Sequence, residues 1–302
     1  MTAVIEARHL TKRYGDTLAL DDVSFTIEAD TIYGLLGRNG AGKTTAMSIL
    51  TAQNFATSGT VRVFGENPYE NERVLPRMCF VRESQKYPDD ATARHALTMA
   101  SLFFANWDAD LAARLVDDFQ LPMKKPIKKL SRGQQSAVGV IIGLACRAEI
   151  TFFDEPYLGL DAVARQLFYD RLLEDYSAHP RTIILSSHLI DEVSSLLERV
   201  IVVERGRILL DDETDAVRSR ATTIVGDAAE VEAFVAGRDV IHRDSLGRVV
   251  SATVFGDLTE ADRRRIEAAG LDLAPVSLQQ LVVRLTMRDD WTNGNGGRGA
   301  AA

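Results

Sequence analysis

An α/β fold with a parallel sheet is predicted by two segments in which a short buried strand ends at a polar loop. Residues 31–50, TIYGLLGRNGAGKTTAMSIL, predict an apolar strand, a glycine-rich loop and a helix. Residues 149–156, EITFFDEP, contain the largely apolar run Ile150–Phe153, which two acids follow. Strands of this kind lie inside parallel sheets, and α/β proteins bind ligands at the carboxyl ends of such strands. The sequence therefore predicts a P-loop α/β core with a ligand site at these two loops.

Length and composition limit the classes of protein to which the chain can belong. Its 302 residues suffice for a large domain and a smaller one. A formal net charge of −8 argues against a protein whose main function is to bind nucleic acid, so no nucleic-acid partner is expected. Cys79 and Cys146 lie far apart, and neither a disulfide scaffold nor a zinc site is indicated. With no signal-type segment and no run of roughly 20 apolar residues, we expect a cytoplasmic chain.

The glycine-rich loop has the spacing G-x-x-x-x-G-K-[ST] of a phosphate-binding P-loop. In such loops the backbone N–H groups surround the phosphates, Lys43 reaches the β and γ oxygens, and the Thr44 hydroxyl binds Mg²⁺. A glycine turn without a ligand is a weak alternative, because a strand precedes the loop and a helix follows it. We therefore predict nucleotide contacts from Gly37, Arg38, Asn39, Gly40, Ala41, Gly42, Lys43, Thr44 and Thr45.

A P-loop site also needs a carboxylate near the metal and a group that activates water. Two acids at the end of the second strand can supply both. Asp154 is predicted to belong to the Mg²⁺ shell, and Glu155 is predicted to orient or deprotonate the attacking water. Paired acids are also common on solvated loops. The P-loop earlier in the chain favours the Mg²⁺–nucleotide site over that alternative.

A third segment, KKLSRGQQSAVGVIIGLAC at 128–146, places a Ser-Arg-Gly-Gln turn directly before the apolar run Ala137–Cys146. The start of a helix has unpaired N–H groups and a partial positive charge, so a turn with Ser131 at the cap and Gly133 beside it suits a phosphate. An ordinary Ser N-cap on a buried helix is the alternative.

Over residues 1–215, the motifs and their order along the chain resemble those of the nucleotide-binding subunits of ABC transporters. The resemblance rests on Tyr14, the P-loop, LSRGQ at 130–134, FFDEP at 152–156, GLD at 159–161, and His188 in ILSSHLIDEV. It implies an ABC-type core with an N-terminal antiparallel β portion at residues 4–28 and a helical subdomain at about 91–147. It also implies ATP and Mg²⁺ as cofactors.

The resemblance further implies a role for each matching residue. Tyr14 would stack on adenine, and His188 would join Lys43 and Glu155 in catalysis on the γ-phosphate side. Asp161 would lie at the contact between subunits. In this family the turn at 131–134 faces the nucleotide of the other subunit, so the partner's site would be completed by Ser131, Gly133 and Gln134.

As a working interpretation, the resemblance implies an ATPase subunit that dimerises and powers a separate integral membrane permease from the inner face of the membrane. A homodimer would have two complete sites, and a heterodimer is the alternative. Export is favoured because APVSLQQLVVRLT, at 274–286, is similar to the tails of exporter-type subunits. A soluble ABC ATPase with another role, such as iron–sulfur assembly, is the rival interpretation.

Two positions depart from the usual family pattern. Arg132 stands where Gly is usual in the signature, and it either adds a cation near phosphate or lies on the surface. In CFVRESQKYPDDAT, alignment puts Glu83 near the place of a metal-contacting glutamine, and Gln85 follows two residues later. Either residue could serve the Mg²⁺, and Glu83 is preferred.

The remaining segments predict helices and a second domain. Residues 92–121 have helical periodicity, with a cap at Asp108, and Phe103, Phe104 and Trp107 either line a permease groove or belong to the core. Residues 216–289 predict a small ferredoxin-like α+β accessory domain in which Thr259 begins a capping box. Residues 290–302 have too few apolar side chains for a core and are expected to be disordered.

Overall fold

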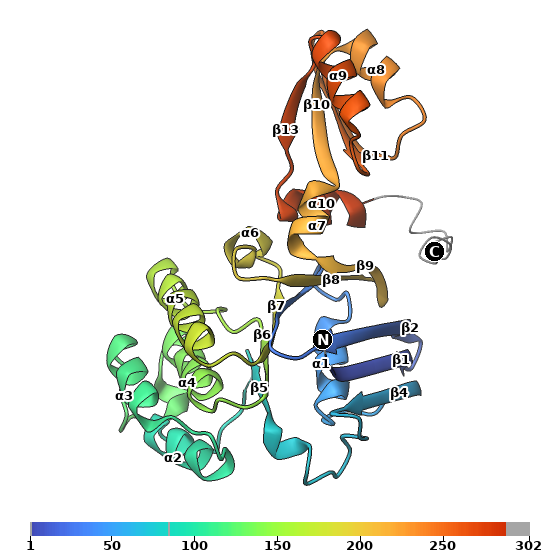
Figure 1. The fold of residues 1–302 in the computed structure, drawn as a ribbon. Helices are drawn as coiled ribbons and strands as arrows, with labels where there is room; N and C mark the ends of the chain where they lie inside the picture. Colours follow the sequence, from blue (N-terminus) through green and yellow to red (C-terminus); the bar gives the residue numbers. More distant parts are fainter. Residues whose placement is uncertain (1, 84, 288–302) are drawn as a thin grey trace. The chain divides into compact units, whose positions relative to one another are not determined.

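The computed structural model describes residues 2–83 and 85–287, which divide between two compact units (Figure 1). The first unit contains the chain up to His188 together with Leu196–Asp211, and the second contains Leu189–Ser195 and the chain from Asp212 onward. This division lies close to residue 215, where the sequence predicts a domain boundary. The tail expected at 290–302 falls outside the described residues.

The first unit begins with an antiparallel sheet of strand order β2-β1-β4. This confirms the N-terminal antiparallel portion expected at residues 4–28, and the sheet also takes in a strand from beyond the P-loop. Along β2, Leu20, Val23, Phe25 and Ile27 are buried among more exposed residues, so this strand presents one apolar face. The strands are β1 (Ala3–Tyr14), β2 (Thr17–Glu28) and β4 (Ser58–Val63).

The central sheet has six strands in the order β5-β6-β7-β3-β8-β9. The five strands from β5 to β8 pair in parallel, which confirms the predicted parallel sheet. Strands β3, β6 and β7 are buried along their whole length, as expected for strands covered on both faces. The bounds are β3 (Ile32–Leu36), β5 (Met78–Arg82), β6 (Ile150–Asp154), β7 (Thr182–Ser187), β8 (Arg199–Glu204) and β9 (Arg207–Glu213).

The two faces of the central sheet are covered by different layers. Phe152 of β6 belongs to a core shared with Met47 of α1 (Lys43–Leu50) and with the antiparallel sheet. On the opposite face, Phe153 packs edge-on against Phe168 of α5 (Ala162–Ala178), with ring centroids 5.4 Å apart. A Cβ on Gly143 of α4 (Arg132–Ala145) would lie 2.4 Å from the Phe153 ring, so glycine is needed for this close approach. Helices α1, α4 and α5 thus hold the strand ends in place.

Helices α2 (Ala93–Phe103), α3 (Ala109–Asp118) and α4 lie together on the side of the central sheet that carries β5, away from the antiparallel sheet (Figure 1). The side chain of Asp108 accepts a hydrogen bond from Leu111 N–H, which confirms the predicted helix cap. Phe103 is exposed, so it does not belong to the core of this layer. Two short 3₁₀ segments, Leu75–Arg77 and Ile127–Lys129, connect the elements.

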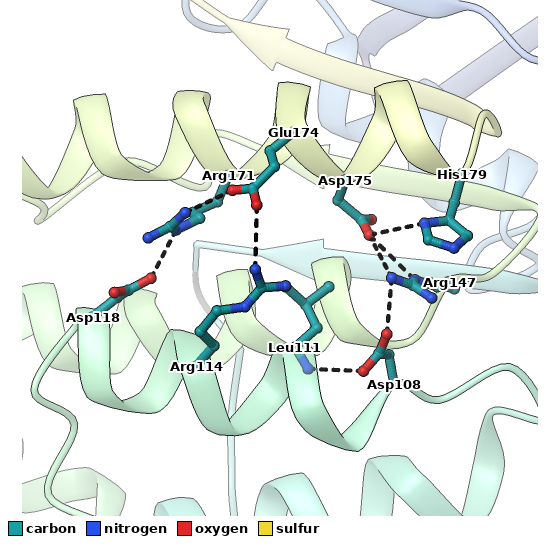
Figure 2. Close-up of polar contacts among 9 residues, drawn as sticks. All are labelled: Asp108, Leu111, Arg114, Asp118, Arg147, Arg171, Glu174, Asp175 and His179. Carbon is teal, nitrogen blue, oxygen red and sulfur yellow. Dashed lines mark hydrogen bonds and ion pairs between the residues drawn. The ribbon is translucent and has the colours of Figure 1, made fainter.

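An ion-pair network ties α3 to α5 (Figure 2). The buried carboxylate of Asp175, on α5, accepts hydrogen bonds from Arg147 at 2.9 Å and from the buried Arg181 at 2.6 Å. Arg147 also contacts Asp108, the cap of α3, at 2.8 Å. Because Asp175 and Arg181 are both removed from water, each depends on the other for charge compensation. A more exposed set joins the same two helices through Arg114, Asp118, Arg171 and Glu174.

The second unit contains a four-stranded sheet of order β11-β12-β10-β13, whose paired strands are antiparallel. Its elements follow the order strand, helix, strand, strand, helix, strand, which is the order of ferredoxin-like domains. Thr259 and Asp262 form the predicted capping box at the start of α9. The bounds are β10 (Ala221–Asp227), β11 (Val240–Leu246), β12 (Val249–Phe255), β13 (Asp272–Pro275), α6 (Ile190–Val193), α7 (Thr214–Ser219), α8 (Ala228–Val235), α9 (Glu260–Ala268) and α10 (Leu278–Thr286). In the described part of the chain, no helix is both long and apolar enough to span a bilayer.

Candidate active site

The P-loop joins β3 to α1, and its glycines are required by close backbone contacts. Gly37 has φ 148°, and a Cβ there would lie 2.1 Å from the carbonyl oxygen of Val203 on β8. Gly42 has φ 114°, and a Cβ there would lie 2.5 Å from the carbonyl oxygen of Ala19. Both residues therefore combine a left-handed conformation with a contact that admits no side chain. The loop is held against β2 and β8 and leaves the first N–H groups of α1 available to an anion.

A pocket of about 530 Å³ lies over this loop. Its wall brings together the P-loop, the ends of β5 and β6, and the loop after β7, as expected for a ligand site at the carboxyl ends of parallel strands. Gly37, Arg38, Asp154 and Gln85 are not among its lining residues. The lining residues are Thr17, Leu18, Ala19, Asn39, Gly40, Ala41, Gly42, Lys43, Thr44, Thr45, Glu83, Glu155, Leu158 and His188.

Lys43 is 6% exposed, and its ammonium group is held on the loop itself. Nζ donates hydrogen bonds to the carbonyl oxygens of Gly37 at 2.8 Å and Arg38 at 3.2 Å, and it lies 3.8 Å from Oε1 of Glu155. Burial lowers the pKa of Lys43, and the carboxylates of Glu155 and Asp154 oppose that shift. Arg38 and Gly37 thus contribute to the pocket through their carbonyl groups, which position the lysine.

Asp154 and Glu155 are positioned by the parallel pairing of β6 with β7, in which Asp154 lies opposite Ser186. The Ser186 hydroxyl donates to Oδ1 of Asp154 at 2.7 Å and accepts from the Glu155 N–H at 3.0 Å. Glu155 takes a left-handed conformation, with φ 50°. Because a non-glycine residue there stores strain, this turn is an unusual feature of the site.

The Glu155 carboxylate has two different oxygens. Oε2 accepts a hydrogen bond from the Tyr157 hydroxyl and lies 2.8 Å from Nδ1 of His188. Oε1 is buried and has no hydrogen-bond partner among the described residues, although Lys43 lies 3.8 Å away. The structure thus brings together the three residues predicted to be catalytic, Lys43, Glu155 and His188.

The predicted signature residues lie outside this pocket. Ser131 caps α4: its Oγ accepts from Gln134 N–H at 3.2 Å, while Oε1 of Gln134 accepts from Ser131 N–H at 3.2 Å. A Cβ on Gly133 would lie 2.8 Å from the carbonyl oxygen of Gly159, so the turn packs directly on the GLD segment. Asp161 caps α5 through a hydrogen bond from Ala164 N–H. Ser131 and Asp161 are exposed, Gly133 and Gln134 are half-buried, and none of the four lines the wall of the pocket.

Comparison with known proteins identifies the family. The ABC transporter family model matches residues 20–158. Nod factor export ATP-binding protein I of Burkholderia orbicola is 32% identical over 221 residues, which cover 71% of this chain and 72% of that protein. The chain belongs to the ATP-binding proteins of ABC transporters. As an ABC ATPase, it binds and hydrolyses ATP to power transport.

Other relatives extend the comparison beyond the first unit. Daunorubicin/doxorubicin resistance ATP-binding protein DrrA of Streptomyces peucetius is 29% identical over 309 residues, covering 94% of this chain and 93% of that protein. Two solved structures share the fold of the ABC ATPase: an ATP-binding subunit of an ABC transporter (TM-score 0.64, 21% identity, 71% of this chain and 92% of that one) and a dimeric bacterial ABC transporter cassette (0.61, 20%, 70% and 98%).

The two departures from the family pattern contact each other in this ABC ATPase. Nη2 of Arg132 lies 3.2 Å from Oε1 of Glu83, and their side chains are 82% and 41% exposed. Such an exposed pair contributes little to stability. Arg132 is therefore a surface residue whose charge is directed at Glu83. Glu83 itself lines the pocket, and its N–H donates to the carbonyl oxygen of Asp154 at 3.2 Å.

The oxygen atoms at the site suit Mg²⁺. Thr44 and Glu83 line the pocket, and Asp154 is buried at the end of β6 with one carboxylate oxygen fixed by Ser186. Mg²⁺ prefers hard oxygen ligands and is usually bound by one or two carboxylates together with substrate phosphates. Within residues 2–83 and 85–287, no group of three or more His, Cys, Asp or Glu side chains is placed to hold a metal ion without substrate phosphates. The residues therefore fit Mg²⁺ that arrives with a nucleotide.

Sequence reasoning missed three hydroxyl groups at this site: those of Tyr157, Ser186 and Ser187. Tyr157 is 1% exposed, and its hydroxyl contacts Glu155, Ser187 and the backbone of His188. The segments DEPY and SSH contain these residues beside predicted catalytic positions. Proximity in sequence was the available signal, but the contacts themselves depend on strand pairing across about thirty residues.

Proposed function

We propose that this chain is the ATPase subunit of an ABC exporter and that two copies form composite ATP sites. One observation carries the proposal: Lys43, Glu155 and His188 converge on one pocket, while Ser131, Gly133 and Gln134 lie outside it. A signature turn that does not reach its own pocket can complete the pocket of a second copy. Asp161 is exposed and comes two residues after Gly159, whose carbonyl oxygen Gly133 packs against, so it would then lie at the contact between the copies.

Within each site, the loop from Gly37 to Thr45 would bind the phosphates through N–H groups at the start of α1. Lys43 would exchange its carbonyl partners for β- and γ-phosphate oxygens and offset the charge that develops on them. Mg²⁺, held by Thr44, Asp154 and Glu83 together with the phosphates, would neutralise phosphate charge. Glu155 would orient the attacking water through Oε1 and accept its proton, with His188 beside it.

Tyr14 is proposed to stack on the adenine ring. It lies at the end of β1, outside the pocket wall, and is 47% exposed, so part of its ring is accessible to a base. Nζ of Lys12 lies 4.7 Å from the ring centroid. A half-exposed aromatic ring next to a cation suits an adenine nucleotide, which carries a flat base and negative phosphates.

The homodimer can be tested by mixing two defective variants, Lys43→Ala and Gly133→Arg. Each variant alone is expected to lose about 10²- to 10³-fold in ATP hydrolysis, because each removes one half of every composite site. In a mixture, about half of the dimers contain one copy of each and therefore one intact site, so activity recovers to about a quarter of that of the unmodified chain. ATP turnover of the mixture is the measurement. Activity that stays at the level of the separate variants would rule out the composite homodimer.

A membrane permease is proposed to bind the exposed apolar side chains of α2. Met99, Leu102 and Phe103 are 51%, 75% and 69% exposed on this helix. Exposed apolar groups that lie together commonly mark a contact with another protein. The export named for the Nod factor protein supports a permease of the exporter class, with the chain on the cytoplasmic face of the membrane.

Phe103→Glu should release the chain from membranes. In cells that contain the permease, the unmodified chain is expected to sediment with membranes and the variant to remain in the supernatant, because burying the new charge is costly. ATP hydrolysis by the purified variant should not change, since Phe103 is absent from the pocket wall. Membrane fractions probed for the chain give the measurement. An unmodified chain that stays in the supernatant would favour a soluble role instead, such as iron–sulfur assembly.

A further inference from the structure

The hydroxyl group of Tyr157 joins two catalytic candidates that come from different strands. Tyr157 follows β6 and is 1% exposed. Its hydroxyl forms a hydrogen bond with Oε2 of Glu155, lies 2.8 Å from Oγ of Ser187, and accepts the His188 N–H at 3.2 Å. One buried atom therefore contacts the Glu155 side chain and the backbone that carries His188.

The phenolic proton of Tyr157 belongs in the bond to Glu155. Burial raises the pKa of Tyr157 above its usual value, and the neighbouring Glu155 carboxylate raises it further, so the hydroxyl keeps its proton. A hydroxyl has one proton to donate, and a bond to a charged acceptor is the stronger choice. Tyr157 thus donates to Oε2, while the His188 N–H and the Ser187 hydroxyl lie around its lone pairs.

This arrangement leaves the two carboxylate oxygens with different surroundings. Oε2 is held by Tyr157 and His188, whereas Oε1 is buried, has no hydrogen-bond partner in the described chain, and lies 3.8 Å from Nζ of Lys43. At that distance the two groups form an ion pair but not a hydrogen bond. If Oε2 were released, the carboxylate could close the remaining distance and turn this ion pair into a direct hydrogen bond.

We propose that Tyr157 is a positioning residue for ATP hydrolysis, which holds Oε2 of Glu155 so that Oε1 forms no hydrogen bond with Lys43 and can accept one from water when ATP is bound. The inference rests on the proposed role of Glu155. It adds a residue that contacts neither phosphate nor water and acts only through the carboxylate. Without this restraint, Glu155 and Lys43 form a direct hydrogen bond with each other, and each is lost to the reaction.

Tyr157→Phe removes only the hydroxyl and is the direct test. We expect kcat for ATP hydrolysis to fall about 10- to 100-fold, which corresponds to losing a hydrogen bond to a charged group. KM for ATP should stay the same, because the phosphate-binding loop is intact. Tyr33→Phe is the matched control: Tyr33 is also 1% exposed, and its hydroxyl accepts the Glu28 N–H at 3.1 Å, away from the pocket. The control should keep its kcat and show a comparable change in Tm.

A double-mutant cycle with Glu155→Gln separates positioning from a general structural role. If Tyr157 acts through the carboxylate, adding Tyr157→Phe to Glu155→Gln lowers the residual rate no further. A second fall of similar size would overturn the inference, as would a Tyr157→Phe variant that keeps its kcat or loses only Tm. An unmodified chain without ATPase activity would instead count against the proposed function. The two ideas therefore fail in different ways.

Discussion

Replacing Glu155 with Gln is expected to lower ATP hydrolysis about 10²- to 10⁴-fold, the range supplied by a positioned acid–base group. The amide keeps the shape of the side chain but cannot accept a proton from water. ATP binding should persist, because the P-loop, Lys43 and Thr44 are unchanged. ATP that is bound but not hydrolysed keeps the two copies together, so the variant should accumulate as a dimer. Steady-state turnover and light scattering in ATP and Mg²⁺ measure both effects.

Glu149→Gln is the matched control for the charge change. Glu149 comes just before β6, at the end opposite Glu155, and it pairs with Arg77 outside the pocket. The same substitution there should leave turnover unchanged. If Glu155→Gln hydrolysed ATP as fast as Glu149→Gln does, Glu155 would not be the residue that activates water, and the free Oε1 atom would need another explanation.

The parts of the site that lie within one short segment could be predicted from the sequence. The strand, glycine loop and helix of the P-loop are consecutive, so Gly37, Lys43 and Thr44 follow from spacing alone. Asp154 and Glu155 can be predicted equally well. A short, largely apolar run is typical of a buried parallel strand, and the two acids mark its end. The caps at Asp108, Ser131 and Thr259 are also local, and each is present.

The parts that depend on pairing between distant segments could not be predicted in the same way. Tyr157 meets Ser187 only because β6 and β7 pair with Asp154 opposite Ser186, and nothing near residue 157 specifies that register. Arg132 and Glu83 were recognised separately as departures from the family pattern. That they contact each other follows from the packing of α4 against β5, which no local pattern describes.

Asp175→Asn should destabilise the first unit by about 3–5 kcal/mol, the cost of leaving buried charges without their partner. The Asp175 side chain is 3% exposed and the Arg181 side chain 5%, and Arg181 has no other carboxylate within ion-pair distance in the described chain. Arg147 keeps its contact with Asp108 (Figure 2), so the loss falls mainly on Arg181. Because a domain is stable by only about 5–15 kcal/mol, such a loss would bring this unit close to unfolding.

Glu174→Gln, at the preceding position of the same helix, tests whether burial is the cause. Glu174 bridges Arg114 and Arg171 at the surface, where water screens the charges, so its loss should change stability far less (Figure 2). Urea unfolding can be followed by the fluorescence of Trp107, which adjoins Asp108, once Trp291, the other tryptophan, has been replaced. Equal midpoints for the two variants would show that Asp175 does not hold α3 and α5 together. A midpoint lowered only by Asp175→Asn would show that the buried pair does.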